Sequence, residues 1–198
     1  MLQQSRIAQD IFVSLKTVPC LGEPFLRGSL LGTEADELSD IDIGLRPVEL
    51  TDIAAVERIV DMMYARHEIE FHDWARSLLP GAAVVSFFLR DVPIFWNVDF
   101  EVIVPASQRL AIRETVPHDQ TAHDLKIWPL ALKYSLRETD AQWPDVTRFV
   151  CRYVGSAPED WSQLRDSLGD ALRAIESDAD GTHSHFISRC WDTYHERT

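Results

Sequence analysis

The chain has 198 residues, 45% of them hydrophobic, so it can bury a core in one large domain or two small ones. It carries 32 acidic and 19 basic residues, a formal net charge of −13, and only three lysines. A sequence-independent nucleic-acid binder needs a basic surface, so this balance predicts no DNA or RNA partner. No run of about 18 apolar residues occurs, so no membrane-spanning segment is predicted.

The acidic excess attracts cations, such as metal ions, polyamines or an amino-sugar compound, or it serves only solubility. The three cysteines, Cys20, Cys151 and Cys190, are widely spaced, which favours reduced thiols and a cytoplasmic location. The first ten residues lack a basic stretch followed by a long apolar run, so we expect no signal peptide. The sequence leaves the oligomeric state open.

The first half of the chain alternates between helical and strand patterns. Its predicted elements, in chain order, are a helix at 2–18, a short strand at 25–28, a loop at 29–39, a strand at 40–45, a helix at 51–69, a turn at Pro80-Gly81, and two antiparallel strands at 82–90 and 94–104. Thr51 is a plausible N-cap for the second helix. Period-2 alternation over 40–45 gives that strand one polar face.

The second half is helical in pattern. Four helices are predicted, at 119–138, 143–154, 158–176 and 183–196. The expected fold is therefore α+β, with a mixed β-sheet and flanking helices at 1–108, followed by a helical bundle at 109–198.

Two pairs of residues in the segment 28–42 carry chemical content. Gly28 and Ser29 follow a strand, where glycine lets the backbone approach a phosphate and serine adds amide and hydroxyl donors. Asp40 and Asp42 lie two apart on a strand, so their carboxylates share a face, and a divalent cation such as Mg²⁺ would relieve their repulsion. Either pair alone is a weak signal, because an Asp-x-Asp pair is common on surface turns.

A third carboxylate is expected to complete such a site. Asp99 is the best candidate, because it lies within the strand WNVDFEV, where an unpaired buried acid would be costly. Glu101 shares its face and is open to three interpretations: general base, partner that orients Asp99, or exposed edge residue.

This combination resembles the DNA polymerase beta-like nucleotidyltransferase superfamily. The hallmark of that superfamily is Gly-Ser, a spacer of about this length, Asp-hydrophobic-Asp-hydrophobic, and a third Asp on a later strand. The resemblance covers roughly residues 24–104, and the helical remainder carries no matching motif. Leu31 departs from it, since many relatives have a polar or basic residue there.

The resemblance implies a transfer of a nucleoside monophosphate, AMP from ATP in the simplest case, to an acceptor hydroxyl with release of pyrophosphate. Gly28 and Ser29 would contact the terminal phosphates, and Asp40 and Asp42 would bind Mg²⁺. Asp99 would ligate a second Mg²⁺ or deprotonate the acceptor.

Two lysines are further candidates for contact with the nucleotide. Lys126 and Lys133 lie seven apart on one predicted helix and hence on roughly one face, from which one could reach the triphosphate. The alternative is that both are ordinary surface lysines.

Size and layout are most similar to the small bacterial aminoglycoside and lincosamide nucleotidyltransferases, which confer antibiotic resistance. A small-molecule acceptor is therefore expected, and the acidic balance of the chain suits a cationic one. Two alternatives are a protein-AMPylating antitoxin of a toxin–antitoxin pair and a nucleotide-binding regulatory protein without turnover. Acceptor choice depends on helices that carry no readable motif.

Overall fold

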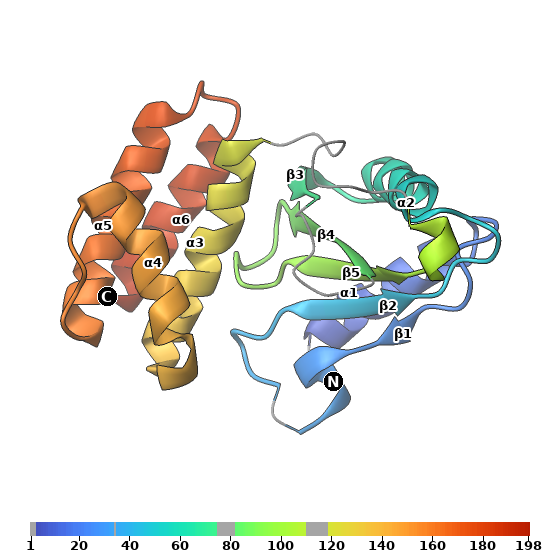
Figure 1. The fold of residues 1–198 in the computed structure, drawn as a ribbon, viewed down its shortest axis with the longest axis horizontal. Helices are drawn as coiled ribbons and strands as arrows, with labels where there is room; N and C mark the ends of the chain where they lie inside the picture. The colour runs from blue at the N-terminus through green and yellow to red at the C-terminus, as the bar shows by residue number, and fades with distance from the viewer. Residues whose placement is uncertain (1–2, 34, 75–81, 110–118) are drawn as a thin grey trace. The chain divides into compact units, whose positions relative to one another are not determined.

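The computed structural model describes residues 3–33, 35–74, 82–109 and 119–198 (Figure 1). It divides into two compact units, Met1–His118 and Asp119–Thr198. The predicted turn at Pro80-Gly81 lies outside the described residues, as do residues 110–118, and the boundary expected after residue 108 stays a prediction.

The first unit is built on one mixed sheet. Its described elements are α1 (Gln3–Leu15), β1 (Phe25–Leu26), β2 (Ile41–Leu45), α2 (Asp52–Arg66), β3 (Ile69–Asp73), β4 (Ala82–Leu89) and β5 (Val98–Ile103). The strand order is β1-β2-β5-β4-β3, in which β2 and β5 are parallel and the other neighbouring pairs are antiparallel. Together with the helical second unit, this confirms the expected α+β fold class.

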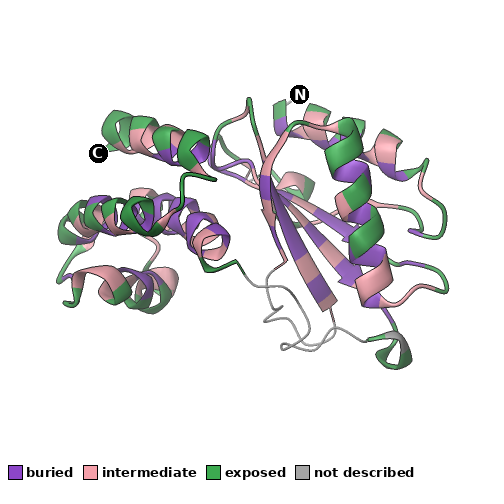
Figure 2. Ribbon diagram, turned by 90° about the horizontal axis from the view of Figure 1, so that it is seen from above, coloured by how far each residue is buried: buried purple, intermediate pink, exposed green. Residues whose placement is uncertain are grey.

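The two faces of this sheet differ in chemistry. Alternate apolar residues of β2, β4 and β5 form one buried cluster with α1 and α2: Ile41, Ile43, Leu45, Ala83, Val85, Phe87, Val98, Phe100 and Val102. Because side chains alternate along a strand, Asp42, Asp99 and Glu101 point to the opposite face. Figure 2 shows the strands as mostly buried, whereas the helices have exposed outer sides. The polar face is where the site lies.

Two predicted elements of this unit differ from the structure. The helix expected to reach residue 69 ends at Arg66, and it is followed by β3, a strand that was not predicted. The strand expected from residue 94 begins only at Val98, because residues 90–97 form a turn in which the amide of Trp96 donates to the carbonyl of Pro93 (2.9 Å). Thr51 caps α2 as predicted, accepting from the amide of Ala54 (3.1 Å).

The second unit is an all-helical bundle, as predicted. Its main helices are α3 (Gln120–Arg137), α4 (Trp143–Val154), α5 (Trp161–Asp178) and α6 (Ser184–Arg197). Trp128 of α3 is fully buried and donates its indole N–H to the carbonyl of Leu168 on α5 (2.8 Å). None of the helices in the described part of the chain combines the length and apolar character needed to cross a membrane. The predicted cytoplasmic location stays a prediction.

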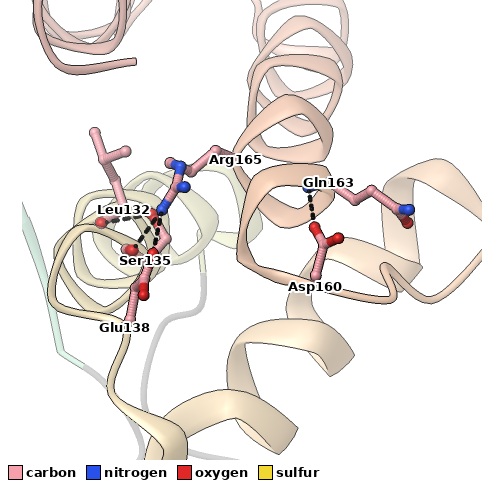
Figure 3. Close-up of polar contacts among 6 residues, drawn as sticks. All are labelled: Leu132, Ser135, Glu138, Asp160, Gln163 and Arg165. Atoms are coloured by element: carbon pink, nitrogen blue, oxygen red, sulfur yellow. Dashed lines mark hydrogen bonds and ion pairs between the residues drawn. The ribbon is translucent and has the colours of Figure 1, made fainter.

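One arginine ties the end of α3 to α5, as Figure 3 shows. The Arg165 guanidinium donates to the carbonyl of Ser135 (3.0 Å) and pairs with Glu138 (3.5 Å). The serine hydroxyl itself donates to the carbonyl of Leu132 (2.8 Å). The Arg165 bond gives a second donor to the Ser135 carbonyl in the last turn of α3, which also accepts from the amide of Glu138 (3.4 Å).

We expect Arg165→Met to lower the free energy of unfolding by about 1–2 kcal/mol, because a charge-assisted hydrogen bond to a helix end is lost while the apolar stem is kept. The matched control is Arg148→Met on α4, whose ion pair with Asp145 is exposed on both sides (76% and 68%), so it should cost under about 0.5 kcal/mol. Urea unfolding of both variants measures the difference. Equal losses of unfolding free energy would show that Arg165 does not stabilise the end of α3.

Candidate metal and nucleotide site

The register of two parallel strands brings three aspartates together. Asp42 of β2 lies directly beside Asp99 of β5, and Asp40 precedes β2 by one residue. One carboxylate oxygen from each of the three lies within 4.8 Å of the others, and all three residues are half-buried. Oxygens bound to one Mg²⁺ at about 2.0–2.1 Å are roughly 3–4 Å apart, so a small side-chain adjustment lets all three ligate one ion.

Backbone and side-chain hydrogen bonds fix this arrangement. The amide of Ile41, the residue between Asp40 and Asp42, donates to the carbonyl of Asn97 (2.9 Å) and so joins the start of β2 to the start of β5. The Asn97 side-chain amide donates to Oδ1 of Asp99 (2.9 Å). Asp99 is thus oriented by its own strand, and one of its oxygens already accepts a hydrogen bond.

The loop before Asp40 is also held in place. Asp36 Oδ1 accepts from the amide of Leu38 and from the hydroxyl of Ser39 (both 3.0 Å), which closes a tight turn. The indole of Trp96 donates to the carbonyl of Glu37 (2.7 Å) and attaches this turn to the segment that leads into β5. Asp40 therefore directly follows a loop whose conformation is fixed by hydrogen bonds.

Gly28 packs directly against one of the acids. Its φ is +60°, and a Cβ built there would lie 1.9 Å from Oδ2 of Asp42. The preceding amide, that of Arg27, donates to the Asp42 carbonyl (2.9 Å). Only glycine fits here, because any side chain would displace the carboxylate and because L-residues rarely adopt this φ.

Ser29 follows with a hydroxyl that has no protein partner. Its Oγ is buried and makes no hydrogen bond in the described structure. Buried hydroxyls are nearly always satisfied, so an orphan beside the acids is a feature that a bound ligand would explain. Ser29 belongs to a short 3₁₀ helix, Gly28–Leu31. The amide of Gly32, the residue after this helix, donates to the Ser29 carbonyl (3.1 Å).

Glu101, the alternative candidate for a general base, has a different environment from Asp99. It shares the polar face with Asp99 but forms an ion pair with the guanidinium of Arg27. Its side chain is 13% exposed, against 38% for the arginine. Of the three sequence-based interpretations, that of an exposed edge residue is wrong.

The two candidate lysines lie on α3 of the second unit. Lys126 is half-buried and Lys133 is 4% exposed, with its ammonium 6.0 Å from the ring centre of Tyr134. The alternative of an ordinary surface lysine therefore does not describe Lys133. A contact of either lysine with the triphosphate stays a prediction.

Sequence reasoning missed three residues on the polar face. Ser86 of β4 lies beside Asp99, and Asp73 of β3 lies beside Ser86, so the row across the sheet runs from Asp42 to Asp73. Ser86 is fully buried, and its hydroxyl has no hydrogen-bond partner among the described residues. Arg27 is the third. A serine within the apolar run AAVVSFFL was the available signal for Ser86.

Comparisons with known proteins bear on the fold. No family model and no curated protein matches this chain. Among solved structures, Cid1, described by its RNA terminal uridylyl transferase activity, has a TM-score of 0.39 and 14% identity, covering 76% of this chain and 40% of that one. The MgGTP-bound Cid1 poly(U) polymerase has a TM-score of 0.41 and 13% identity, covering 76% and 41%.

The GLD-2/RNP-8 complex is a third structural match. It has a TM-score of 0.41 and 13% identity, covering 87% of this chain and 57% of that one. The chain thus spans about 40–57% of the length of these three structures. At this identity the likeness is one of fold alone, and none of the three is described as an antibiotic-modifying enzyme.

These matches contradict the prediction of no nucleic-acid partner, because Cid1 is described as an RNA terminal uridylyl transferase. The prediction rested on the net charge of −13, which sums every residue of the chain. Binding of a strand end depends instead on the few charges around the site, so a chain-wide sum does not exclude it.

We expect Gly28→Ala to abolish Mg²⁺-dependent ATP binding and to destabilise the first unit, since the new methyl group collides with the Asp42 carboxylate. Gly155→Ala is the matched control: its φ is +74°, but a Cβ there meets nothing within 4 Å. It therefore reports the conformational cost alone, about 1–2 kcal/mol. Calorimetric titration with ATP and a thermal melt of both variants check this, and a Gly28→Ala protein that binds ATP normally would contradict it.

Ser86→Ala should leave the melting temperature unchanged or raise it, because a buried hydroxyl without a partner costs about 1–3 kcal/mol in the native state. A clear drop in the melting temperature would show that the hydroxyl is satisfied by the protein itself. Val85→Ala on the same strand is the contrasting variant, since it empties part of the apolar core and should destabilise.

Proposed function

We propose that this chain is a Mg²⁺-dependent nucleotidyltransferase that transfers a nucleoside monophosphate, AMP from ATP in the first instance, to an acceptor hydroxyl. The observation that carries the proposal is the convergence of Asp40, Asp42 and Asp99 within 4.8 Å, beside a glycine that packs on Asp42. The orphan hydroxyl of Ser29 next to this cluster supports a ligand with hydrogen-bond acceptors, such as a phosphate.

The donor set suits a hard divalent cation. Three carboxylates on one polar face would hold Mg²⁺, which supplies charge neutralisation for the phosphates when bound. Around it, Gly28 permits close approach of the triphosphate, and Ser29 Oγ donates to a terminal phosphate oxygen. These residues act by positioning and charge stabilisation, which is what phosphoryl-group chemistry requires.

The positions of these residues in the sheet indicate the side on which pyrophosphate leaves and the side from which the acceptor attacks. Gly28 and Ser29 follow β1, on the outer side of β2, so the pyrophosphate leaving group lies on that side. In-line displacement then requires the acceptor oxygen to approach from the opposite side, over β5 and β4. The new bond joins that oxygen to the α-phosphorus, the bond to the β-phosphate oxygen breaks, and the hydroxyl proton passes to a base.

Asp99 is the residue proposed for that base, or for a ligand to a second ion. It stands on the acceptor side of Asp42, Asn97 donates to its Oδ1, and one of its carboxylate oxygens lies within 4.8 Å of oxygens of Asp40 and Asp42. Lys126 and Lys133 remain proposed contacts for the nucleotide.

We propose a small molecule as the acceptor. An acidic protein suits a cationic small molecule, and an aminoglycoside-like or lincosamide-like antibiotic is an example of that class. The 3′-hydroxyl of an RNA and a hydroxyl of a protein, as in an AMPylating antitoxin, are to be tested beside it. A regulatory protein without turnover is less favoured, because the three carboxylates and the glycine are all in place.

The test is pyrophosphate release with Mg²⁺ and each NTP, in the presence of kanamycin, lincomycin or an RNA oligonucleotide with a free 3′-hydroxyl. We expect Asp42→Asn to lower turnover at least about 100-fold at near wild-type melting temperature, because the amide keeps the shape and removes the charge that holds the ion. ATP affinity in calorimetry should likewise fall when a chelator removes Mg²⁺.

Asp61→Asn is the matched control, since Asp61 is exposed on α2 and the substitution removes the same charge away from the polar face. Normal turnover of Asp42→Asn, or equal ATP affinity with chelator, would overturn the proposal. Transfer to the oligonucleotide alone would assign RNA as the acceptor class.

A further inference from the structure

Arg27 is a cation on the face that carries the acids. Beyond the pairing of Leu26 with Ile43, its amide donates to the Asp42 carbonyl (2.9 Å), which extends the β1–β2 ladder by one residue. Residues opposite each other in a ladder share a face, so the Arg27 side chain lies on the same side as Asp42. There its guanidinium forms the ion pair with Glu101 of β5.

The ion pair is unequal in its exposure. The Glu101 side chain is 13% exposed and therefore largely desolvated, whereas that of Arg27 is 38% exposed. Glu101 is fixed on a central strand, while the arginine is at the end of a two-residue edge strand. A long side chain with this exposure can change partner without unfolding its surroundings, and the carboxylate cannot follow it.

The position of Arg27 in the chain points to a second partner. It directly precedes Gly28, which packs on Asp42, and Ser29, whose buried hydroxyl has no partner. In the absence of nucleotide, the guanidinium offsets the repulsion among Glu101 and the three aspartates. A bound Mg²⁺–triphosphate supplies cationic charge for the aspartates and brings phosphate oxygens to the Gly28 side.

Resting on the proposed function, we propose that Arg27 binds the β- and γ-phosphates and the departing pyrophosphate, and that Glu101 is its partner in the nucleotide-free protein and not the general base. The planar guanidinium matches phosphate oxygens in a bidentate fashion. Its charge opposes the negative charge that grows on the leaving group as the bond between the α-phosphorus and the bridging oxygen breaks. Binding of the triphosphate and pairing with Glu101 therefore compete for one cation.

The first experiment measures the affinities of Mg·ATP, Mg·pyrophosphate and AMP for Arg27→Ala by calorimetry. Loss of a charge-assisted contact should weaken ATP and pyrophosphate about 10- to 100-fold and leave AMP within about twofold. Arg27→Lys keeps the charge and should restore part of the loss. Arg46→Ala is the matched control: Arg46 is an exposed arginine whose guanidinium lies 4.6 Å from the ring centre of Phe25, and its loss should change no affinity.

The second experiment uses Glu101→Gln, which keeps the shape of the side chain and removes its charge. Freed from its partner, Arg27 should bind Mg·pyrophosphate about 3- to 10-fold more tightly, and this gain should vanish in the Arg27→Ala background. A purely structural role of the pair would lower the melting temperature without this gain.

Three results would overturn the inference: wild-type pyrophosphate affinity of Arg27→Ala, an equal loss for AMP, or a Glu101→Gln gain that persists without Arg27. Failure of the proposed function looks different, because the wild-type protein itself would then bind ATP no more tightly with Mg²⁺ than without it.

Discussion

The mutual repulsion of three carboxylates is the constraint on which the rest of the first unit depends. Asp40, Asp42 and Asp99 are held within 4.8 Å by the parallel pairing of β2 and β5, and their strands are anchored on the other face by a fully apolar cluster. Like charges at this distance oppose folding. The energy that holds them together comes from burial of apolar residues of α1, α2 and the sheet.

The register of the sheet decides whether the three carboxylates lie together. β2 and β5 are neighbours in space but are separated in the chain by α2, β3 and β4, so the acid cluster exists only once these two strands have paired across that segment. A slip of one residue would turn Asp99 into the apolar core and Val98 toward the acids. The indole bond from Trp96 to Glu37, and the bond between Ile41 and Asn97, fix the ends of both strands against such a slip.

The sequence predicts the features that depend on neighbouring residues in the chain, such as strand alternation and helix caps. Alternation over 40–45 predicted β2 and its polar face, and Thr51 predicted the start of α2. β3 was not predicted because the helical pattern of 51–69 overlaps its start, and the segment IEFHD is short and only partly apolar. The ion pair of Arg27 and the position of Ser86 beside Asp99 depend on which strands become neighbours, and the burial of Lys133 depends on helix packing. These are tertiary facts that no spacing in the chain records.

Two of the three buried hydroxyls that lack a partner in the described structure, those of Ser29 and Ser86, belong to the first unit, and the third is that of Thr147 on α4. Ser29 and Ser86 lie on opposite sides of the acids, one after β1 and one on β4, and neither buried hydroxyl has a partner in the described structure. A sequence selected for stability alone would favour alanine at both positions, since each orphan costs about 1–3 kcal/mol. Arg27 and Glu101 form an ion pair, whereas neither serine hydroxyl has a partner among the described residues. The pair therefore offsets charge while the site is empty, and the serines remain available to groups that enter from either side of the aspartates.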